Sequence, residues 1–213
     1  MKTDDLVSLL ATGTQPIDTD GLRRRALAVL AAGTLAAAAI LFAWLGVNPF
    51  LGEMPGQPMF WVREVFCAVL AGAGVLVVAR LGRPGATLGG LPLLLALPIV
   101  AMWVLGAVVL VGAPPAERTA LIRGVSWTVC SANIAALSIP VFVAVIVWQR
   151  RLAPTMLRRA GAAGGFAAGA IGALVYTLHC PELEAPFLGL WYVLGMLVPA
   201  AAGALLGPRL LRW

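Results

Sequence analysis

Charged residues are scarce in this sequence, and histidine and cysteine are scarcer still. Of the 213 residues, 11% are charged and 61% are hydrophobic, whereas a soluble domain has about 25% charged residues. No polar segment is long enough to form a separate soluble domain. The single histidine excludes haem held by two histidines, and neither a phosphate-binding loop nor a Ser–His–Asp set is present. The scarcity of charge therefore predicts a polytopic membrane protein.

Ionisable residues are also missing from the middle of the long apolar runs. Transporters and proton-coupled pumps usually need such groups inside the membrane. Asn133 and Ser138 are the notable polar residues of the fourth run. This absence argues against an ion-coupled transporter.

Six apolar runs recur along the chain, and each is long enough to cross a bilayer as a helix. They are residues 26–47, 61–79, 89–111, 124–148, 157–178 and 186–206. The sequence therefore predicts an all-α fold, in which residues 26–213 form a bundle of six transmembrane helices. Residues 1–25 would form a separate N-terminal segment.

The distribution of positive charge predicts the orientation of this bundle. The chain has 15 Lys and Arg residues, and with the N-terminus inside, only Arg63, Arg118 and Arg123 fall outside. Positive charge favours the cytoplasmic side of a membrane, so we expect both termini in the cytoplasm. The sequence pI of about 10.2 then reflects cationic loops near membrane lipids, and direct nucleic acid binding is not expected.

The N-terminal segment has the pattern of a short amphipathic helix followed by a flexible tether. Negative charges would lie in the first turn, where they suit the helix dipole, and leucines would share one face. The residues are Asp4, Asp5, Leu6, Leu9 and Leu10. Turn-forming residues dominate positions 12–20.

The most reactive stretch is residues 176–182 (YTLHCPE), which holds the single histidine, His179, and one of the three cysteines, Cys180. It lies between the fifth and sixth runs, on the outer side. Cys130 lies near the outer end of the fourth run. Cys130 and Cys180 could form a disulfide, or bind copper or zinc together with His179. Glu182 is a possible additional ligand.

The alternative is that the cysteines are small apolar residues that fill the core, as free Cys often does. This interpretation is favoured for Cys67, near the outer end of the second run. It explains Cys180 poorly, because packing does not account for adjacent His and Cys residues in a loop. If the membrane is a bacterial inner membrane, all three cysteines lie toward an oxidising periplasm.

Gly161, Gly165 and Gly169 are spaced by four in the fifth run. Small residues at this spacing let a helix pack closely on a neighbour. We expect that neighbour to be another helix of the same bundle, with dimerisation as the less favoured alternative. The oligomeric state itself is not predicted.

Seven segments, taken in order, resemble those of a known family. They are residues 1–10 (MKTDDLVSLL), 127–130 (WTVC), 137–140 (LSIP), 153–155 (APT), 176–182 (YTLHCPE), 191–195 (WYVLG) and 210–213 (LLRW). Together they cover nearly the whole chain and resemble the NrsF family, the negative regulators of sigma F. The HCPE element and the terminal LRW are the more specific of these.

The resemblance implies a signalling protein and not an enzyme. Members of the family are six-span anti-sigma factors of the bacterial inner membrane, which hold an extracytoplasmic-function sigma factor inactive. Two periplasmic cysteines are implicated in sensing metal or redox stress, and they correspond to Cys130 and Cys180. The N-terminal helix would then bind a groove of the sigma factor, although a helix lying on the membrane surface fits it equally well.

Two other classes of protein use similar residues. A membrane thiol oxidoreductase needs a redox partner and commonly a CxxC pair, and neither is visible. A small metal or solute transporter needs polar groups in the middle of the membrane, and these are missing.

Overall fold

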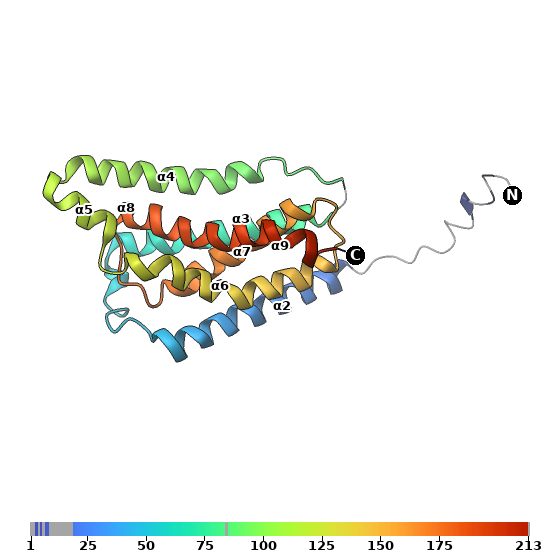
Figure 1. The fold of residues 1–213 in the computed structure, drawn as a ribbon, viewed down its shortest axis with the longest axis horizontal. Helices are drawn as coiled ribbons and strands as arrows, with labels where there is room; N and C mark the ends of the chain where they lie inside the picture. Colours follow the sequence, from blue (N-terminus) through green and yellow to red (C-terminus); the bar gives the residue numbers. More distant parts are fainter. Residues whose placement is uncertain (1–2, 4, 6, 9–18, 84, 213) are drawn as a thin grey trace.

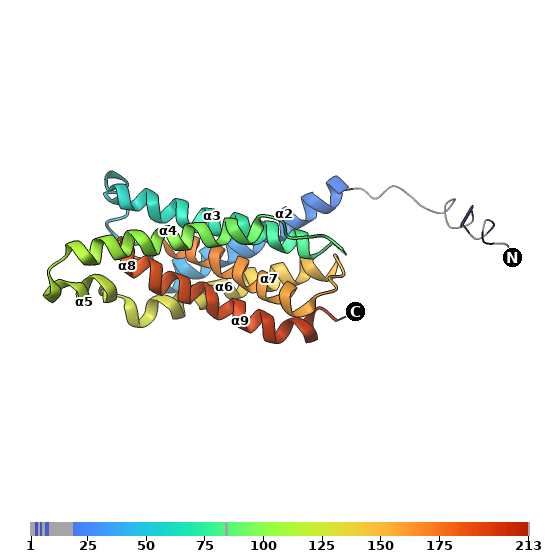
Figure 2. The same ribbon diagram turned by 90° about the horizontal axis from the view of Figure 1, so that it is seen from above.

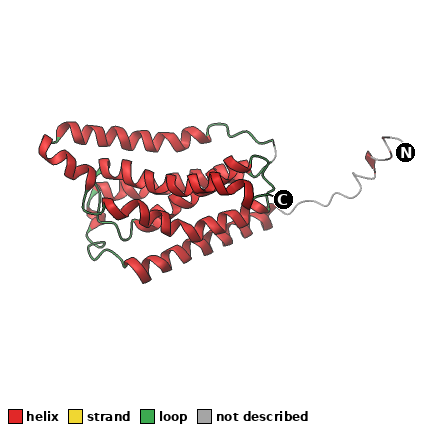
Figure 3. Ribbon diagram, viewed as in Figure 1, coloured by secondary structure: helices red, strands yellow, loops and turns green. Residues whose placement is uncertain are grey.

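The computed structural model describes residues 3, 5, 7, 8, 19–83 and 85–212. Every regular element among them is helical, with no strand, as Figure 3 shows. The predicted all-α fold is therefore confirmed.

Within the described residues, six long helices make up the bundle, in the predicted order. They are α2 (Thr19–Ile40), α3 (Pro58–Leu81), α4 (Leu91–Gly112), α6 (Trp127–Arg150), α7 (Leu157–Tyr176) and α9 (Val193–Leu210). The shorter elements are the π-helical turns η1 (Leu41–Leu45) and η3 (Leu188–Tyr192), the 3-10 turn η2 (Met54–Gly56), and the helices α5 (Pro115–Arg123) and α8 (Ala185–Phe187). The sequence did not predict α5. It also placed the start of the first helix at residue 26, whereas α2 begins at Thr19 and includes Arg23, Arg24 and Arg25.

Helix α7 is the centre of the bundle and packs against α3, α6 and α9 (Figures 1 and 2). Its glycines allow backbones to touch: a Cβ at Gly165 would overlap the Pro199 carbonyl of α9, and a Cβ at Gly161 would overlap the Gly203 carbonyl. The glycine spacing of four thus brings α7 against α9 within one chain, as predicted.

Five stretches of the described chain are long and apolar enough to cross a membrane. They are Gly21–Leu45, Pro58–Leu81, Leu91–Gly112, Pro115–Arg150 and Ala185–Leu210. The sixth long helix, α7, is less apolar because it consists largely of Ala and Gly. It is enclosed by its neighbours, so few of its side chains need to face lipid.

The outward faces of the bundle are apolar. Large hydrophobic side chains are exposed along α4, where Val111 is 79% exposed, and on α2 and α9. Water would not tolerate such a surface on a soluble monomer, whereas lipid tails do. These faces indicate a membrane protein.

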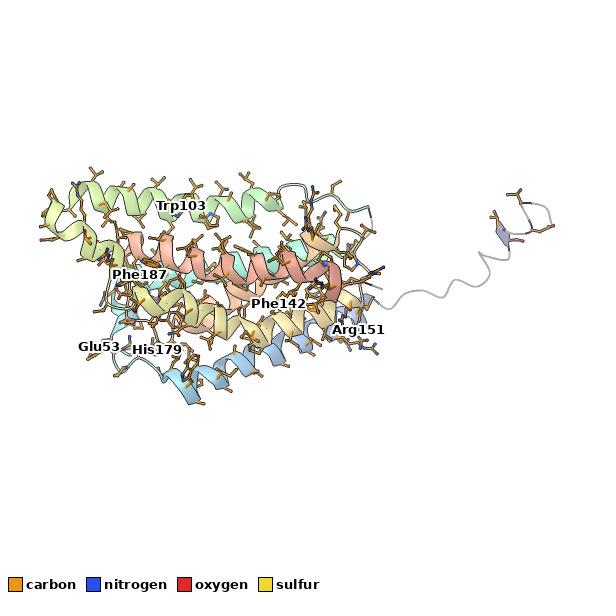
Figure 4. All side chains as sticks on the ribbon, viewed as in Figure 1. Glu53, Trp103, Phe142, Arg151, His179 and Phe187 are labelled. Atoms are coloured by element: carbon orange, nitrogen blue, oxygen red, sulfur yellow. The ribbon has the colours of Figure 1, made fainter. Side chains whose placement is uncertain are left out.

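The start of α2 and the end of α9 lie at the same end of the bundle (Figures 1 and 2). We call this the terminal end, and Arg151 lies there (Figure 4). The opposite end, here the loop end, consists of residues 46–57, 113–126 and 177–184, and carries Glu53 and His179 (Figure 4).

Candidate functional site

Cys180 lies in the loop that joins α7 to α8 at the loop end. The helix unwinds gradually there, since the amides of His179 and Cys180 both donate to the Tyr176 carbonyl at 3.0 Å. This turn folds Cys180 inward, and its side chain is fully buried.

The structure brings Cys180 against Cys130, which lies in the first turns of α6. Cys130 is also fully buried, and the two thiols interact directly with each other. Both are free thiols and not a disulfide. Two predicted site residues from distant parts of the chain therefore form a buried dithiol pair.

The surroundings of Cys180 favour its ionised form. The Cys130 thiol lowers the pKa of Cys180 by hydrogen bonding, and the Tyr192 hydroxyl, the backbone of Glu182 and the Ser126 hydroxyl act in the same direction against the effect of burial. The Ser126 Oγ lies 3.8 Å from the Cys180 Sγ. Because the thiolate is the form that attacks electrophiles and binds metals, these neighbours favour such chemistry at Cys180.

The Glu182 carboxylate accepts hydrogen bonds at the beginning of α6. Its Oε1 accepts hydrogen bonds from the amides of Val125 at 2.6 Å and Ser126 at 3.2 Å, and from the Ser126 hydroxyl at 3.4 Å. A carboxylate at a helix N-terminus satisfies free amides and suits the helix dipole. Gly124, with φ +55°, lies beneath it, and a Cβ there would overlap the Glu182 carboxylate.

His179 turns away from the dithiol pair. Its Nδ1 lies 3.0 Å from the Gly46 carbonyl oxygen, and its ring packs against Tyr176 with centroids 5.6 Å apart. Within the described part of the chain, no group of three or more His, Cys, Asp or Glu side chains is positioned to hold a metal ion. The predicted set of Cys130, Cys180 and His179 is thus not assembled here.

Arg63 of α3 holds the Cys180 loop in place through hydrogen bonds to its backbone. It is fully buried, and its Nη1 donates to the carbonyls of Cys180 at 2.8 Å and Glu182 at 3.2 Å. Its Nη2 donates to the Thr177 carbonyl at 3.2 Å and pairs with Glu64 Oε1 at 3.2 Å. Sequence reasoning treated Arg63 only as an outer positive charge. The signal that could have indicated this buried role is the presence of a charged residue inside the apolar stretch at the start of α3.

Two tyrosines line the same region. Tyr176 and Tyr192 are fully buried, and their ring centroids are 6.1 Å apart. Both hydroxyls are close enough to interact electrostatically with Cys180. Among the described residues, neither hydroxyl oxygen has a hydrogen-bond partner.

Cys67 lies in the same apolar core, fully buried on α3. It is not part of any metal-binding group of the described residues. Its position agrees with the predicted packing role.

The predicted partner-binding helix falls largely outside the described residues. Asp4, Leu6, Leu9 and Leu10 are not described, and Asp5 is exposed in a helical turn. Its binding role therefore stays a prediction.

Comparison with known proteins gives a consistent result. The sequence profile of the family described as "NrsF: Negative regulator of sigma F" matches residues 10–213. A "Probable anti-sigma-F factor NrsF" of Azospira oryzae is 46% identical over 213 residues, covering 100% of both chains. An "Anti-sigma-F factor NrsF" of Caulobacter vibrioides is 37% identical over 218 residues, again covering 100% of both chains. No solved structure matches the chain.

Proposed function

Because the chain belongs to the NrsF family of negative regulators of sigma F, we propose that it is a membrane-bound anti-sigma factor. It binds a sigma factor of the extracytoplasmic-function class in the cytoplasm and keeps it inactive. It releases this partner when Cys130 and Cys180 sense metal or redox stress. The observation that carries the sensing step is the contact between the two thiols, which come from separate elements.

The distribution of charge supports an orientation with the terminal end in the cytoplasm of a bacterium. Most of the arginines lie in the first or last turns of the helices at that end, or in the segments that follow and join them: Arg23, Arg24, Arg25, Arg80, Arg83, Arg150, Arg151, Arg158, Arg159, Arg209 and Arg212. Positive charge is retained on the cytoplasmic side of the inner membrane. The dithiol pair at the loop end then lies near the periplasmic surface.

The bonds around Cys180 supply a physical link between the two ends. Arg63 joins the Cys180 loop to α3, and Glu182 joins the same loop to α6. Both helices run the length of the bundle and pack against α7. A new bond between the sulfurs would therefore bias the packing of helices that reach the terminal end.

The energy required for release is modest. A tenfold loss of affinity for the sigma factor corresponds to about 1.4 kcal/mol. A disulfide contributes about 2–4 kcal/mol, and a metal bond to thiolates can contribute more. The free energy of either event at the dithiol pair is large enough to cause this loss of affinity, provided that the two packings of the helices differ in their affinity for the sigma factor.

The sensing step is tested by single serine variants in cells that carry a reporter of sigma-dependent transcription. Cys130→Ser and Cys180→Ser should still bind the sigma factor but give no induction by copper salts or a thiol oxidant. Cys67→Ser is the matched control, a third buried thiol of the same core, and should induce normally. Normal induction in either pair variant would refute the sensing role.

The docking step is tested by co-purifying the detergent-solubilised protein with sigma factors of the same genome. A one-to-one complex that is lost on deleting residues 1–11 would support the N-terminal helix as the binding element. A complex that survives the deletion would assign docking to the arginine-rich loops of the terminal end. The lack of any complex would refute the anti-sigma function.

A further inference from the structure

An apolar groove lies between the first turns of α2 and the last turns of α6, at the terminal end. It has a volume of about 180 Å³, and its lining includes Leu22, Arg25 and Val29 of α2, together with Trp148 and Arg151 at the end of α6. The groove is at the opposite end of the bundle from the dithiol pair, and the proposed function makes no use of it.

The groove forms because α2 and α6 touch at one level and leave space at the next. An added Cβ at Gly33 would lie 2.8 Å from the Ala144 Cβ, so the two helices are in close contact there. Val29, Ala26 and Leu22 follow Gly33 at helical spacing toward the terminal end, and they line the groove instead. The space between the helices therefore opens toward the terminal end.

The walls of the groove suit part of a flexible apolar chain. Its volume is smaller than the roughly 300–1,000 Å³ of pockets that enclose a compact drug-sized ligand. Leu22 lines it, and Leu22 and Leu27 are 41% and 58% exposed on the outer face of α2. Such an outer face is in contact with lipid in a membrane protein, so the apolar chain at hand is a lipid acyl chain.

Two arginines at the groove select the headgroup of that lipid. Arg25 and Arg151 are both exposed and come from different elements. The ion pair found among the described residues joins Arg63 to Glu64 at the loop end, so it neutralises neither of these two guanidinium groups. A guanidinium donates in pairs to phosphate oxygens, and tryptophan, here Trp148, is favoured at the level of lipid headgroups.

A second apolar groove, between α3 and α4, lacks this combination. It is lined by residues such as Val65 and Leu105, and none of its described lining residues is charged. An apolar wall alone does not distinguish one lipid from another, whereas an apolar wall with two cations does. The selective site is therefore the groove between α2 and α6.

We propose that this groove binds one anionic phospholipid, with an acyl chain along the apolar walls and the phosphate between Arg25 and Arg151. Because α2 packs mainly against α6, the lipid joins an outer helix to the rest of the bundle. The proposal depends on the bundle lying in a membrane and not on the anti-sigma function.

The direct test is native mass spectrometry of the full-length protein in detergent, titrated with phosphatidylglycerol or with phosphatidylcholine of the same acyl chains. Each arginine beside an anionic lipid contributes about fivefold in affinity, so one phosphatidylglycerol per chain should bind about 25-fold more tightly than phosphatidylcholine. Equal affinity for the two lipids would overturn the proposal. Displacement of phosphatidylglycerol by an equal concentration of inorganic phosphate would also overturn it, because the site would then recognise a free anion.

The arginines are tested by Arg25→Gln and Arg151→Gln. Each substitution should weaken phosphatidylglycerol binding about fivefold and leave phosphatidylcholine binding unchanged. Arg83→Gln is the matched control, because it removes the same charge from an exposed position at the terminal end but outside the groove. Equal effects of all three substitutions would overturn the proposal in favour of a general attraction to positive charge.

The apolar part of the groove is tested by Ala28→Phe, which fills the space without changing any charge. This variant should lose the bound lipid, whereas Ala36→Phe, at an exposed position of α2 outside the groove, should retain it. A ligand that binds the folded state raises the melting temperature, so phosphatidylglycerol should stabilise the Ala36→Phe protein and not the Ala28→Phe protein. Equal stabilisation of both would overturn the proposal.

Two other occupants of the groove give different results in the same experiments. Lipid binding that appears only after residues 1–11 are deleted would assign the groove to the N-terminal segment of the chain. A dimer that is lost in the Ala28→Phe variant would assign it to a second copy of the chain. Either result would overturn the proposal.

Discussion

At the scale of single residues, the loop end depends on one buried cation. Arg63 satisfies three carbonyl groups of the Cys180 loop and pairs with Glu64, whose other oxygen accepts a 3.0 Å bond from the Thr177 hydroxyl. An arginine suits this position because its planar guanidinium donates in several fixed directions at once. The loop that carries Cys180 is thus held mainly by a residue of another helix.

Removing this guanidinium should destabilise the protein strongly. Arg63→Met leaves the loop carbonyls and the Glu64 carboxylate without their partner, and we expect a loss of about 3 kcal/mol. Thermal unfolding in detergent, followed by circular dichroism, measures it. Arg118→Met is the control, because Arg118 is exposed and should change stability by less than about 0.5 kcal/mol. Equal effects of the two substitutions would contradict the role given to Arg63.

At the scale of the helices, the contact between α7 and α9 sets the geometry of the bundle. The glycines of α7 meet the backbone of α9 without intervening side chains. Backbone atoms cannot move aside as a flexible side chain can, so this contact tolerates no added volume. The same rigidity is what would transmit a change at the loop end to the terminal end.

Adding one methyl group at this contact should therefore be costly. Gly165→Ala introduces a Cβ that overlaps the Pro199 carbonyl, and we expect destabilisation of about 1–3 kcal/mol from overpacking. Gly72→Ala in α3 is the matched control, since its added Cβ meets nothing within 4 Å. That variant should be neutral or gain up to about 1 kcal/mol from better helix propensity. The melting temperatures of the two variants test this expectation. A Gly165→Ala protein as stable as the unsubstituted protein would argue against the close contact between α7 and α9.

At the scale of the whole molecule, the part of the chain that the structure describes has an even number of long helices, so α9 finishes at the end of the bundle where α2 begins. Apolar faces surround the bundle, and the arginines concentrate at the terminal end. The proposed function requires this end to lie in the cytoplasm, where a sigma factor is found, and the dithiol pair to lie on the other side of the membrane.

Cysteine labelling tests this orientation directly. The native cysteines are all fully buried, so an added surface cysteine is the one that a membrane-impermeant thiol reagent reaches. Glu53→Cys at the loop end should be labelled from outside in intact spheroplasts. Arg151→Cys at the terminal end should be labelled only after the membrane is opened. The reverse pattern would contradict the proposed orientation.

The sequence predicts the helices well because run length and glycine spacing are local properties. It also singles out Cys130 and Cys180 as candidate residues, since reactive residues stand out against an apolar background, and their sensing role stays a prediction. It does not predict that Glu182 caps α6, that His179 turns toward Gly46, or that Arg63 holds the loop. Each of those partners is distant in the sequence, so only the fold brings them together.

In the proposed function, chemistry at the dithiol pair changes the affinity for the sigma factor at the opposite end of the molecule. The most direct measurement is the affinity of a fluorescently labelled sigma factor for the protein in lipid nanodiscs, before and after the pair is loaded with Cu(I) or oxidised. We expect affinity at least about tenfold weaker after treatment, with no change in the Cys130→Ser and Cys180→Ser variants. The same affinity before and after treatment of the intact protein would contradict it.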